Sequence, residues 1–188
     1  MDAIRSLILR EVEIITPLDA LEKEHISDVK GWISSGVEIF RIEKPDNPPK
    51  HLVSYFVLID KEKQFLLLVD HIKAQLWLPT GGHVDVSEDP RETVKREARE
   101  ELGIDAAFLN NELPFFITVT RTVGLTAGHT DVSLWYLLKG SVNEELRFDP
   151  TEFKRVQWFS FDEVLGMPLS SLDPQMHRFV QKLILHKI

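Results

Sequence analysis

The apolar and polar positions of this chain change their period several times, and the changes predict strands and helices in alternation. Stretches rich in β-branched, aromatic and other apolar residues predict six strands: His51–Asp60, Gln64–Asp70, Leu76–Leu78, Phe115–Val123, Asp131–Lys139 and Lys154–Phe159. Because Phe65–Val69 is apolar at every position, we expect the second strand to be covered on both faces. Asp60–Lys63 would form the turn between the first two strands.

A spacing of three to four residues between apolar positions predicts helices elsewhere. Thr16–Pro17 is a helix start, and the helical period continues to Ser35. Ser160, with Glu163 three residues later, predicts a short helix with a capped start. Asp173–Pro174 opens the last helix, whose apolar stripe is typical of core packing and consists of Met176, Phe179, Val180, Leu183 and Ile184.

The order of these elements predicts a mixed sheet with helices on both faces, which is an α/β/α layered domain. Residues 45–49, Pro-Asp-Asn-Pro-Pro, form a stiff polar segment and the best internal boundary. We therefore expect an N-terminal helical extension over residues 1–48 and a second unit over residues 49–188. The extension has three interpretations: packing on the core for stability, which we favour, a cover over a cleft, or a contact in a homodimer.

One further helix has signals at both of its ends. Asp89 caps the start, Pro90 fits the first helical position, and Glu92 follows three residues after the cap. Gly103 stands where a left-handed residue ends a helix. The sequence therefore predicts a helix over Pro90–Leu102.

The polar side of this helix carries candidate metal ligands. Val94, Ala98 and Leu102 form an apolar stripe, and along one edge lies an arc of roughly 100° that holds Glu97, Glu100 and Glu101. Carboxylates crowded at a buried edge repel one another, and the single guanidinium of Arg96 does not neutralise three of them. A hard divalent cation, Mg²⁺ or Mn²⁺, would do so. The alternative is a surface helix with ion pairs one turn apart.

The residues before the helix favour a ligand site over a surface helix. Gly81–Gly82 follows Trp77-Leu78-Pro79 and predicts a tight turn at which a backbone carbonyl can approach a ligand closely. Glu88 adds another acid near the helix start.

Composition excludes several classes of protein. The 188 residues, 43% of them hydrophobic, suit one globular domain with a sizeable core. A net charge of −8 argues against stable binding to nucleic acid, and no apolar run approaches the ~20 residues of a membrane span. The N-terminus lacks the pattern of a secretory signal. Zero cysteines exclude disulfides and thiolate metal sites and fit a cytoplasmic protein.

Residues 82–104 carry the pattern G-x5-E-x7-R-E-U-x-E-E-x-G-U, where U is apolar, with no departure at any fixed position. The pattern is the Nudix box, so the sequence resembles the Nudix hydrolases. The fixed positions are Gly82, Glu88, Arg96, Glu97, Ala98, Glu100, Glu101, Gly103 and Ile104. The resemblance covers about residues 50–188 and implies a Nudix-type α/β/α sandwich.

The resemblance also implies an activity. Nudix hydrolases typically cleave a phosphoanhydride (pyrophosphate) bond in a nucleoside diphosphate linked to another group, with Mg²⁺ or Mn²⁺ activating the attacking water. By resemblance, the metal ligands are the Gly82 carbonyl, Glu97, Glu100 and Glu101. Arg96 would orient the carboxylates, and Glu88 would pair with basic groups that fix the loop.

The general base stays open between Glu97 and an acid from a later loop: Glu144, Glu145 or Glu152. His83, His129 and Asp131 either contact the substrate or serve as a loop histidine and a strand-end capping pair. A zinc site made of His71, His83 and His129 lacks close ligand spacing. Three aromatic residues either stack on a nucleobase or pack in the core: Trp77, Trp135 and Phe116.

Two other functions compete with hydrolysis. Isopentenyl-diphosphate isomerases share the fold but use a cysteine acid, which this chain lacks. A non-catalytic nucleotide-binding or regulatory module would typically have lost box carboxylates, and all are present here. We therefore expect an enzyme acting on a small molecule. Nucleotide sugars, ADP-ribose-like molecules and damaged nucleotides all remain open as substrates.

Overall fold

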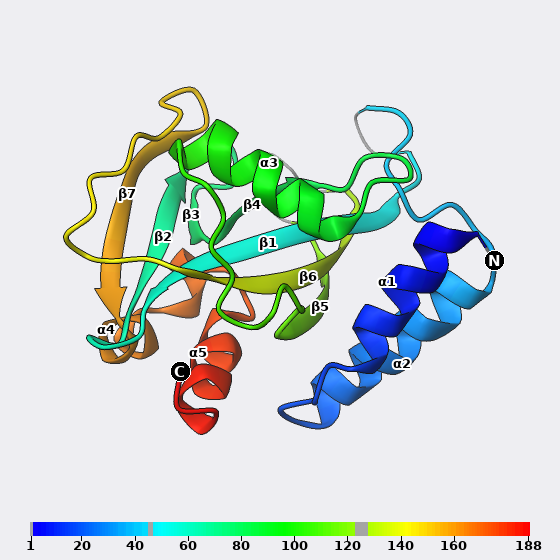
Figure 1. The fold of residues 1–188 in the computed structure, drawn as a ribbon, viewed down its shortest axis with the longest axis horizontal. Helices are drawn as coiled ribbons and strands as arrows, with labels where there is room; N and C mark the ends of the chain where they lie inside the picture. Colours follow the sequence, from blue (N-terminus) through cyan, green and yellow to red (C-terminus); the bar gives the residue numbers. More distant parts are fainter. Residues whose placement is uncertain (1, 45–46, 123–127) are drawn as a thin grey trace.

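The computed structural model describes residues 2–44, 47–122 and 128–188. Seven strands form one mixed sheet, with helices on its two faces (Figure 1). The strands are β1 (Lys50–Asp60), β2 (Phe65–His71), β3 (Leu76–Leu78), β4 (Thr80–His83), β5 (Phe116–Arg121), β6 (Thr130–Lys139) and β7 (Phe153–Ser160). The helices are α1 (Ala3–Glu13), α2 (Ala20–Ser34), α3 (Pro90–Leu102), α4 (Phe161–Gly166) and α5 (Met176–Leu185), with a 3₁₀ turn at Leu169–Ser171.

The sheet has the order β3-β2-β1-β6-β5, while β4 pairs with β1 and β7 pairs with β2. β1 and β6 are parallel, in a register that runs from Lys50 opposite Thr130 to Ile59 opposite Lys139. The remaining strand pairs are antiparallel. The long parallel pair matters for function, because it sets the N-terminal ends of β1 and β6 side by side.

Two buried apolar clusters, one on each face of the sheet, confirm the predicted layers. The first cluster joins α1, α2 and α3 to the sheet and includes Ile8, Ile33, Val94, Ala98 and Leu102. The second joins α4 and α5 to the opposite face and includes Val164, Met176, Phe179, Val180 and Leu183. Burial of Leu66–Val69 confirms that β2 is covered on both sides.

The predicted turn at Gly81–Gly82 is wrong, because both glycines lie in strand β4. Gly81 pairs with Tyr55 and Gly82 pairs with Ser54 of β1. Gly81 has φ +137°, and a β-carbon there would lie 2.1 Å from the Ser54 carbonyl oxygen. The glycines therefore allow two backbones to approach closely, a requirement that a sequence does not distinguish from that of a turn.

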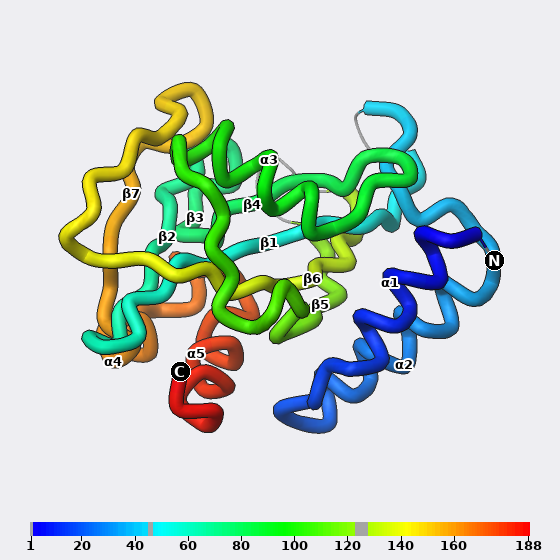
Figure 2. The backbone as a smooth tube through the Cα atoms, in the orientation of Figure 1, coloured from blue at the N-terminus to red at the C-terminus, as the bar shows by residue number. Residues whose placement is uncertain are grey.

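The N-terminal region differs from its prediction in two ways. Helix α2 begins at Ala20, not at Thr16–Pro17, because the Asp19 side chain caps it by accepting from the backbone N–H of Glu22. Helix α1 was not predicted, although its first turn is capped by Asp2. The two helices pack side by side (Figure 2).

Smaller differences concern element ends. The last helix begins at Met176, two residues after Asp173–Pro174, and Ile184 is 45% exposed, so Ile184 does not belong to the buried stripe. The predicted strand end at Val123, and Pro45 and Asp46 of the predicted boundary, lie outside the described residues. Among the helices of the described segments, none has the length and apolarity that crossing a bilayer requires.

Candidate functional site

A cleft of about 780 Å³ opens where α3, β4 and the neighbouring ends of β5 and β6 meet. It is polar, and acidic and basic side chains both line it. The lining residues include Arg41, Lys44, Lys73, Gly81, Gly82, His83, Arg96, Glu97, Glu100, Glu101, Arg121, His129, Asp131 and Glu152. The three glutamates on the polar edge of α3 therefore border a cavity, unlike the side chains of a plain surface helix.

Helix α3 has the predicted ends. The Asp89 side chain accepts from the Arg91 backbone N–H at 3.0 Å, and Pro90 occupies the first helical position. Gly103 is left-handed, with φ 67°. The predicted capping role of Glu92 is wrong, because its carboxylate binds Lys95 Nζ at 2.9 Å instead.

Three glutamates on α3 differ in environment. Glu101 is 6% exposed, and its Oε2 accepts from the Gly81 backbone N–H at 2.9 Å. Burial, with the nearby charge of Glu97, raises the pKa of Glu101 to about 9. Burial also raises the pKa of Glu97, whereas the side chain of Glu100 is 62% exposed. The cleft therefore carries carboxylates that resist ionisation while no cation is near.

Arg96 ties the loop before α3 to the helix. Its Nη1 lies 2.5 Å from Glu97 Oε1 and 3.6 Å from Glu100 Oε2. Its Nη2 lies 3.2 Å from Glu88 Oε2 and donates to the His83 carbonyl at 3.3 Å. This guanidinium therefore fixes the orientation of Glu97 relative to β4.

Glu88 holds the loop from its other side. Its Oε2 accepts from the Thr93 hydroxyl at 2.6 Å and from the Asp85 backbone N–H at 3.1 Å. Together with the Arg96 contacts, these bonds place the carboxylate between the loop and the first turns of α3. The geometry agrees with the expectation that this acid pairs with a basic group to fix the loop.

The structure separates the three later acids. Glu152 lines the cleft, and its charge contributes to the raised pKa of both Glu97 and Glu101. Glu144 and Glu145 are not among the lining residues of the described chain. Of the three later-loop acids that the sequence left open, only Glu152 is placed to act in the cleft.

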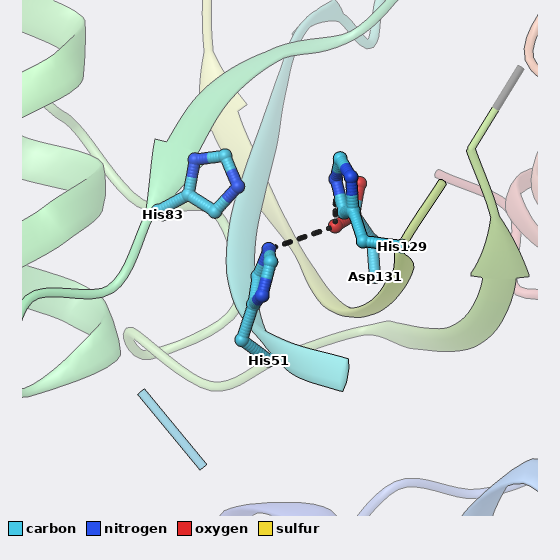
Figure 3. A group of neighbouring side chains, drawn as sticks. All are labelled: His51, His83, His129 and Asp131. Carbon is cyan, nitrogen blue, oxygen red and sulfur yellow. Dashed lines mark ion pairs between the residues drawn. The ribbon is translucent and has the colours of Figure 1, made fainter. Parts of the chain in front are cut away.

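Four side chains converge at one end of the cleft (Figure 3). The expected residues His83, His129 and Asp131 are joined by His51, and one nitrogen or oxygen from each lies within 4.8 Å of the others. His71 lines the cleft but lies outside the group, so the trio His71, His83 and His129 is wrong as a cluster. Burial lowers the pKa of His83 to about 3, and the positive charge of Arg41 acts in the same direction.

The sequence did not indicate His51 as a site residue, because its position at the start of a predicted strand suggests only a structural role. What brings it to the site is the register of two strands, in which His51 stands opposite Asp131 in the parallel pair β1–β6. A register between distant strands is set by the tertiary fold, so no local pattern indicated it.

Two of the three aromatic candidates pack in the core. Trp135 and Phe116 are fully buried, and their rings contact each other at 5.6 Å between centroids. Trp77 packs edge-on against Phe159 at 4.9 Å. Of the described residues that line the cleft, none is one of these three. The prediction that they stack on a nucleobase is therefore not supported.

Comparisons with known proteins agree with this geometry. The family model described as the NUDIX domain matches residues 49–183. A bis(5'-nucleosyl)-tetraphosphatase (asymmetrical) of Mus musculus is 48% identical over 102 residues, which cover 53% of this chain and 66% of that protein. An RNA pyrophosphohydrolase of Gluconacetobacter diazotrophicus is 31% identical over 93 residues, which cover 44% of this chain and 56% of that protein.

Among solved structures, a NUDIX-family hydrolase from Clostridium perfringens superposes with a TM-score of 0.57 at 22% identity, covering 72% of this chain and 97% of that one. At this identity the likeness concerns the fold alone. The chain spans 56% and 66% of the lengths of the two relatives named above.

Proposed function

The chain belongs to the Nudix family, and from that premise we propose that it hydrolyses a phosphoanhydride bond in a nucleoside diphosphate linked to another group. The names of the two relatives, a pyrophosphohydrolase and a tetraphosphatase, support this class of reaction. The observation that carries the proposal is that the three box glutamates of α3, Glu97, Glu100 and Glu101, all line the cleft. A small molecule with a diphosphate group is the substrate class that suits a cleft of this size and mixed charge.

The donor chemistry of α3 fits a hard divalent cation, Mg²⁺ or Mn²⁺. Burial, with the charges of neighbouring carboxylates, raises the pKa of Glu97 and of Glu101, and a bound cation would offset this by stabilising the ionised form of both. The Gly82 carbonyl, Glu97, Glu100 and Glu101 would hold it. When bound, the cation would neutralise charge on the phosphoryl oxygens and lower the pKa of the attacking water.

The chain's own residues would perform the remaining tasks. Arg96 would hold Glu97 in place through their 2.5 Å contact. Because that contact occupies Glu97, we propose Glu152 as the general base, which would take the proton of the water. Basic residues that line the cleft would bind the substrate phosphates: Arg41, Lys44, Lys73 and Arg121.

One end of the cleft would receive the rest of the substrate. His83, His129 and Asp131 line it and would contact this part of the molecule.

We also propose that residues 1–48 form an extension that stabilises the domain of residues 49–188. The support is the ion pair between Glu22 of α2 and Lys182 of α5, at 2.7 Å, with both side chains buried.

The test is release of phosphate or nucleotide from a panel of nucleoside diphosphate derivatives, with and without Mg²⁺, by the wild type and Glu101→Gln. We expect metal-dependent turnover of at least one compound, reduced by roughly 10²-fold or more in the variant. Glu92→Gln is the matched control, because Glu92 lies on the same helix but pairs with Lys95 in solvent. Absence of turnover together with absence of Mg²⁺ binding by calorimetry would overturn the proposal and favour a nucleotide-binding or regulatory module.

A further inference from the structure

We propose that His51, His83, His129 and Asp131 form a second metal site, which takes Zn²⁺ and is separate from the carboxylates of α3. The inference goes beyond the proposed function, because binding of Zn²⁺ by this group does not require any hydrolytic activity. Within the described residues, this is the group of histidine and acidic side chains whose ligand atoms converge, all within 4.8 Å of one another.

Strands β1, β4 and β6, with His129 directly before β6, bring the four residues together. His51 is opposite Asp131 in the parallel pair of β1 and β6. His83 of β4 is opposite Val53, which is two residues from His51 and so faces the same side of the sheet. Figure 3 shows the side chains turned toward one another from these strands. Sites placed on adjacent strands hold their ligands more rigidly than sites on loops.

An unprotonated ring nitrogen of His51 faces the centre of the group. Its Nδ1 lies 2.8 Å from the Pro48 carbonyl oxygen, which can only accept, so Nδ1 carries the proton. The opposite nitrogen, Nε2, is therefore a lone-pair donor, and it lies 3.5 Å from Asp131 Oδ1. Both of these atoms are buried, and neither has a hydrogen-bond partner among the residues that the structure describes. A metal-binding histidine is commonly held by this kind of hydrogen bond from its other nitrogen to a carbonyl.

His129 also reaches Asp131. Its Nε2 lies 3.1 Å from Asp131 Oδ1. Thr122 holds the other side of the residue, because its hydroxyl donates to the His129 carbonyl at 3.1 Å and lies 3.3 Å from His129 Nδ1.

The lone pair of His51 Nε2 and the carboxylate oxygen Asp131 Oδ1 thus face each other in a buried position, with His129 Nε2 beside them. Buried acceptors that converge in this way repel unless a cation lies between them. The separations of 3.1 Å and 3.5 Å suit a tetrahedral ion. With Zn–N bonds of about 2.0–2.1 Å, neighbouring ligand atoms lie about 3.3 Å apart. Only the wider pairs, up to 4.8 Å, require the side chains to close in.

The donor set selects the ion. Three imidazoles and one carboxylate suit Zn²⁺ and are unsuited to Mg²⁺, which prefers oxygen ligands in octahedral geometry. His83, His129 and Asp131 line the cleft, so an ion can reach the group from solvent, whereas His51 is fully buried behind them. The four residues thus provide four ligands for the ion, and the group is open to solvent on the side that faces the cleft.

Arg41 is the group that an incoming ion must displace. Its Nη1 lies 3.3 Å from His83 Nε2, so the guanidinium occupies that ligand atom. Its positive charge also opposes a cation in the centre of the group. We therefore expect that removing this charge strengthens zinc binding, an effect that a purely structural histidine cluster would not produce.

The test is calorimetric titration of the full chain with Zn²⁺, on the wild type and on Asp131→Asn, His83→Gln and Arg41→Gln. The site predicts weaker binding in the first two variants, by at least the roughly 10–100-fold that losing a supporting partner costs. Arg41→Gln should bind more tightly than the wild type. His71→Gln is the matched control, since His71 lines the same cleft outside the group, and its affinity should not change.

Glu101→Gln separates the two sites. Zinc bound by the histidine group is retained in this variant, whereas zinc bound only by the carboxylates of α3 is lost. Co²⁺ titration adds a spectroscopic readout, because tetrahedral nitrogen and oxygen ligation gives visible absorption that Asp131→Asn should abolish. Thermal unfolding by circular dichroism verifies that each variant is folded. If folded Asp131→Asn and His83→Gln both bind Zn²⁺ as the wild type does, a proton shared by His51 and Asp131 explains the cluster and the proposal is overturned.

Discussion

Gly82 and Glu97 lie so close together that residue 82 has room only for a hydrogen atom as its side chain. A β-carbon on Gly82 would fall 2.1 Å from Glu97 Oε1 and 2.6 Å from the carboxyl carbon. The strand that pairs with β1 and the helix that carries the carboxylates are therefore in direct contact at this point. The fixed glycine of the box is explained by packing against a box glutamate.

Gly82→Ala should displace the Glu97 carboxylate, because its terminal atoms are the ones that a methyl group meets. We expect turnover to fall by roughly 10²-fold or more, measured as kcat/KM on whichever compound the substrate panel identifies. Gly31→Ala is the control, since a β-carbon there has no neighbour within 4 Å in the described part of the chain. In that variant activity should be unchanged, and helix α2 should gain about 0.5–1 kcal/mol of stability. Wild-type activity in Gly82→Ala would contradict the role of Glu97.

Glu152 and Glu145 offer a matched comparison for the general base. Glu152→Gln should lower kcat by roughly 10²-fold or more with little change in KM, because the base acts in the chemical step. Glu145→Gln, which changes an acid outside the described lining of the cleft, should have no such effect. Wild-type kcat in Glu152→Gln would instead assign the base to Glu97.

The pair formed by Glu22 and Lys182 should dominate the attachment of the N-terminal helices. Removal of one partner leaves a buried charge, so Glu22→Gln or Lys182→Met should lower the free energy of unfolding by about 3–5 kcal/mol. Glu13→Gln is the control, because its partner Lys30 lies 3.0 Å away in an exposed pair, and should cost less than about 1 kcal/mol. Urea unfolding monitored by tryptophan fluorescence measures both. Equal effects of the two changes would show that the buried pair does not hold the extension.

Glu11 should make stability depend on pH. Burial raises the pKa of Glu11 from its usual 4.5 to about 7, while its carboxylate accepts from the Tyr136 hydroxyl at 2.9 Å. The folded protein therefore binds this proton more tightly than the unfolded chain does. The stabilisation is fully present below pH 4.5 and is lost as pH rises through 7.

Comparison of the wild type with Glu11→Gln isolates this group from all others that titrate. Between pH 5 and pH 8 the free energy of unfolding of the wild type should fall relative to that of the variant by on the order of 2 kcal/mol. Urea unfolding at intervals of one pH unit measures the difference. A difference that stays constant, or one that grows in the opposite direction, would refute the raised pKa.

The sequence alone determined the features that depend on neighbours along the chain. Asp89, Pro90 and Gly103 fixed both ends of α3, because caps and left-handed termini are satisfied within one helical turn. Ser160 and Glu163 form the predicted capping box for the same reason. The apolar period placed the six predicted strands to within one residue at the ends that can be compared, and missed β4. The Nudix box indicated the cleft-lining carboxylates.

Only the tertiary structure decided which distant residues meet. The register of β1 and β6 sets His51 opposite Asp131, and no local pattern specifies such a pairing. Gly81, which was expected in a turn, lies in a strand that packs closely against the backbone of Ser54. Contacts made only in the folded chain likewise place Glu152, and not Glu145, at the lining of the cleft. Helix caps and periodicity act through contacts between near neighbours, whereas strand register and the membership of a site depend on contacts that the chain makes only when folded.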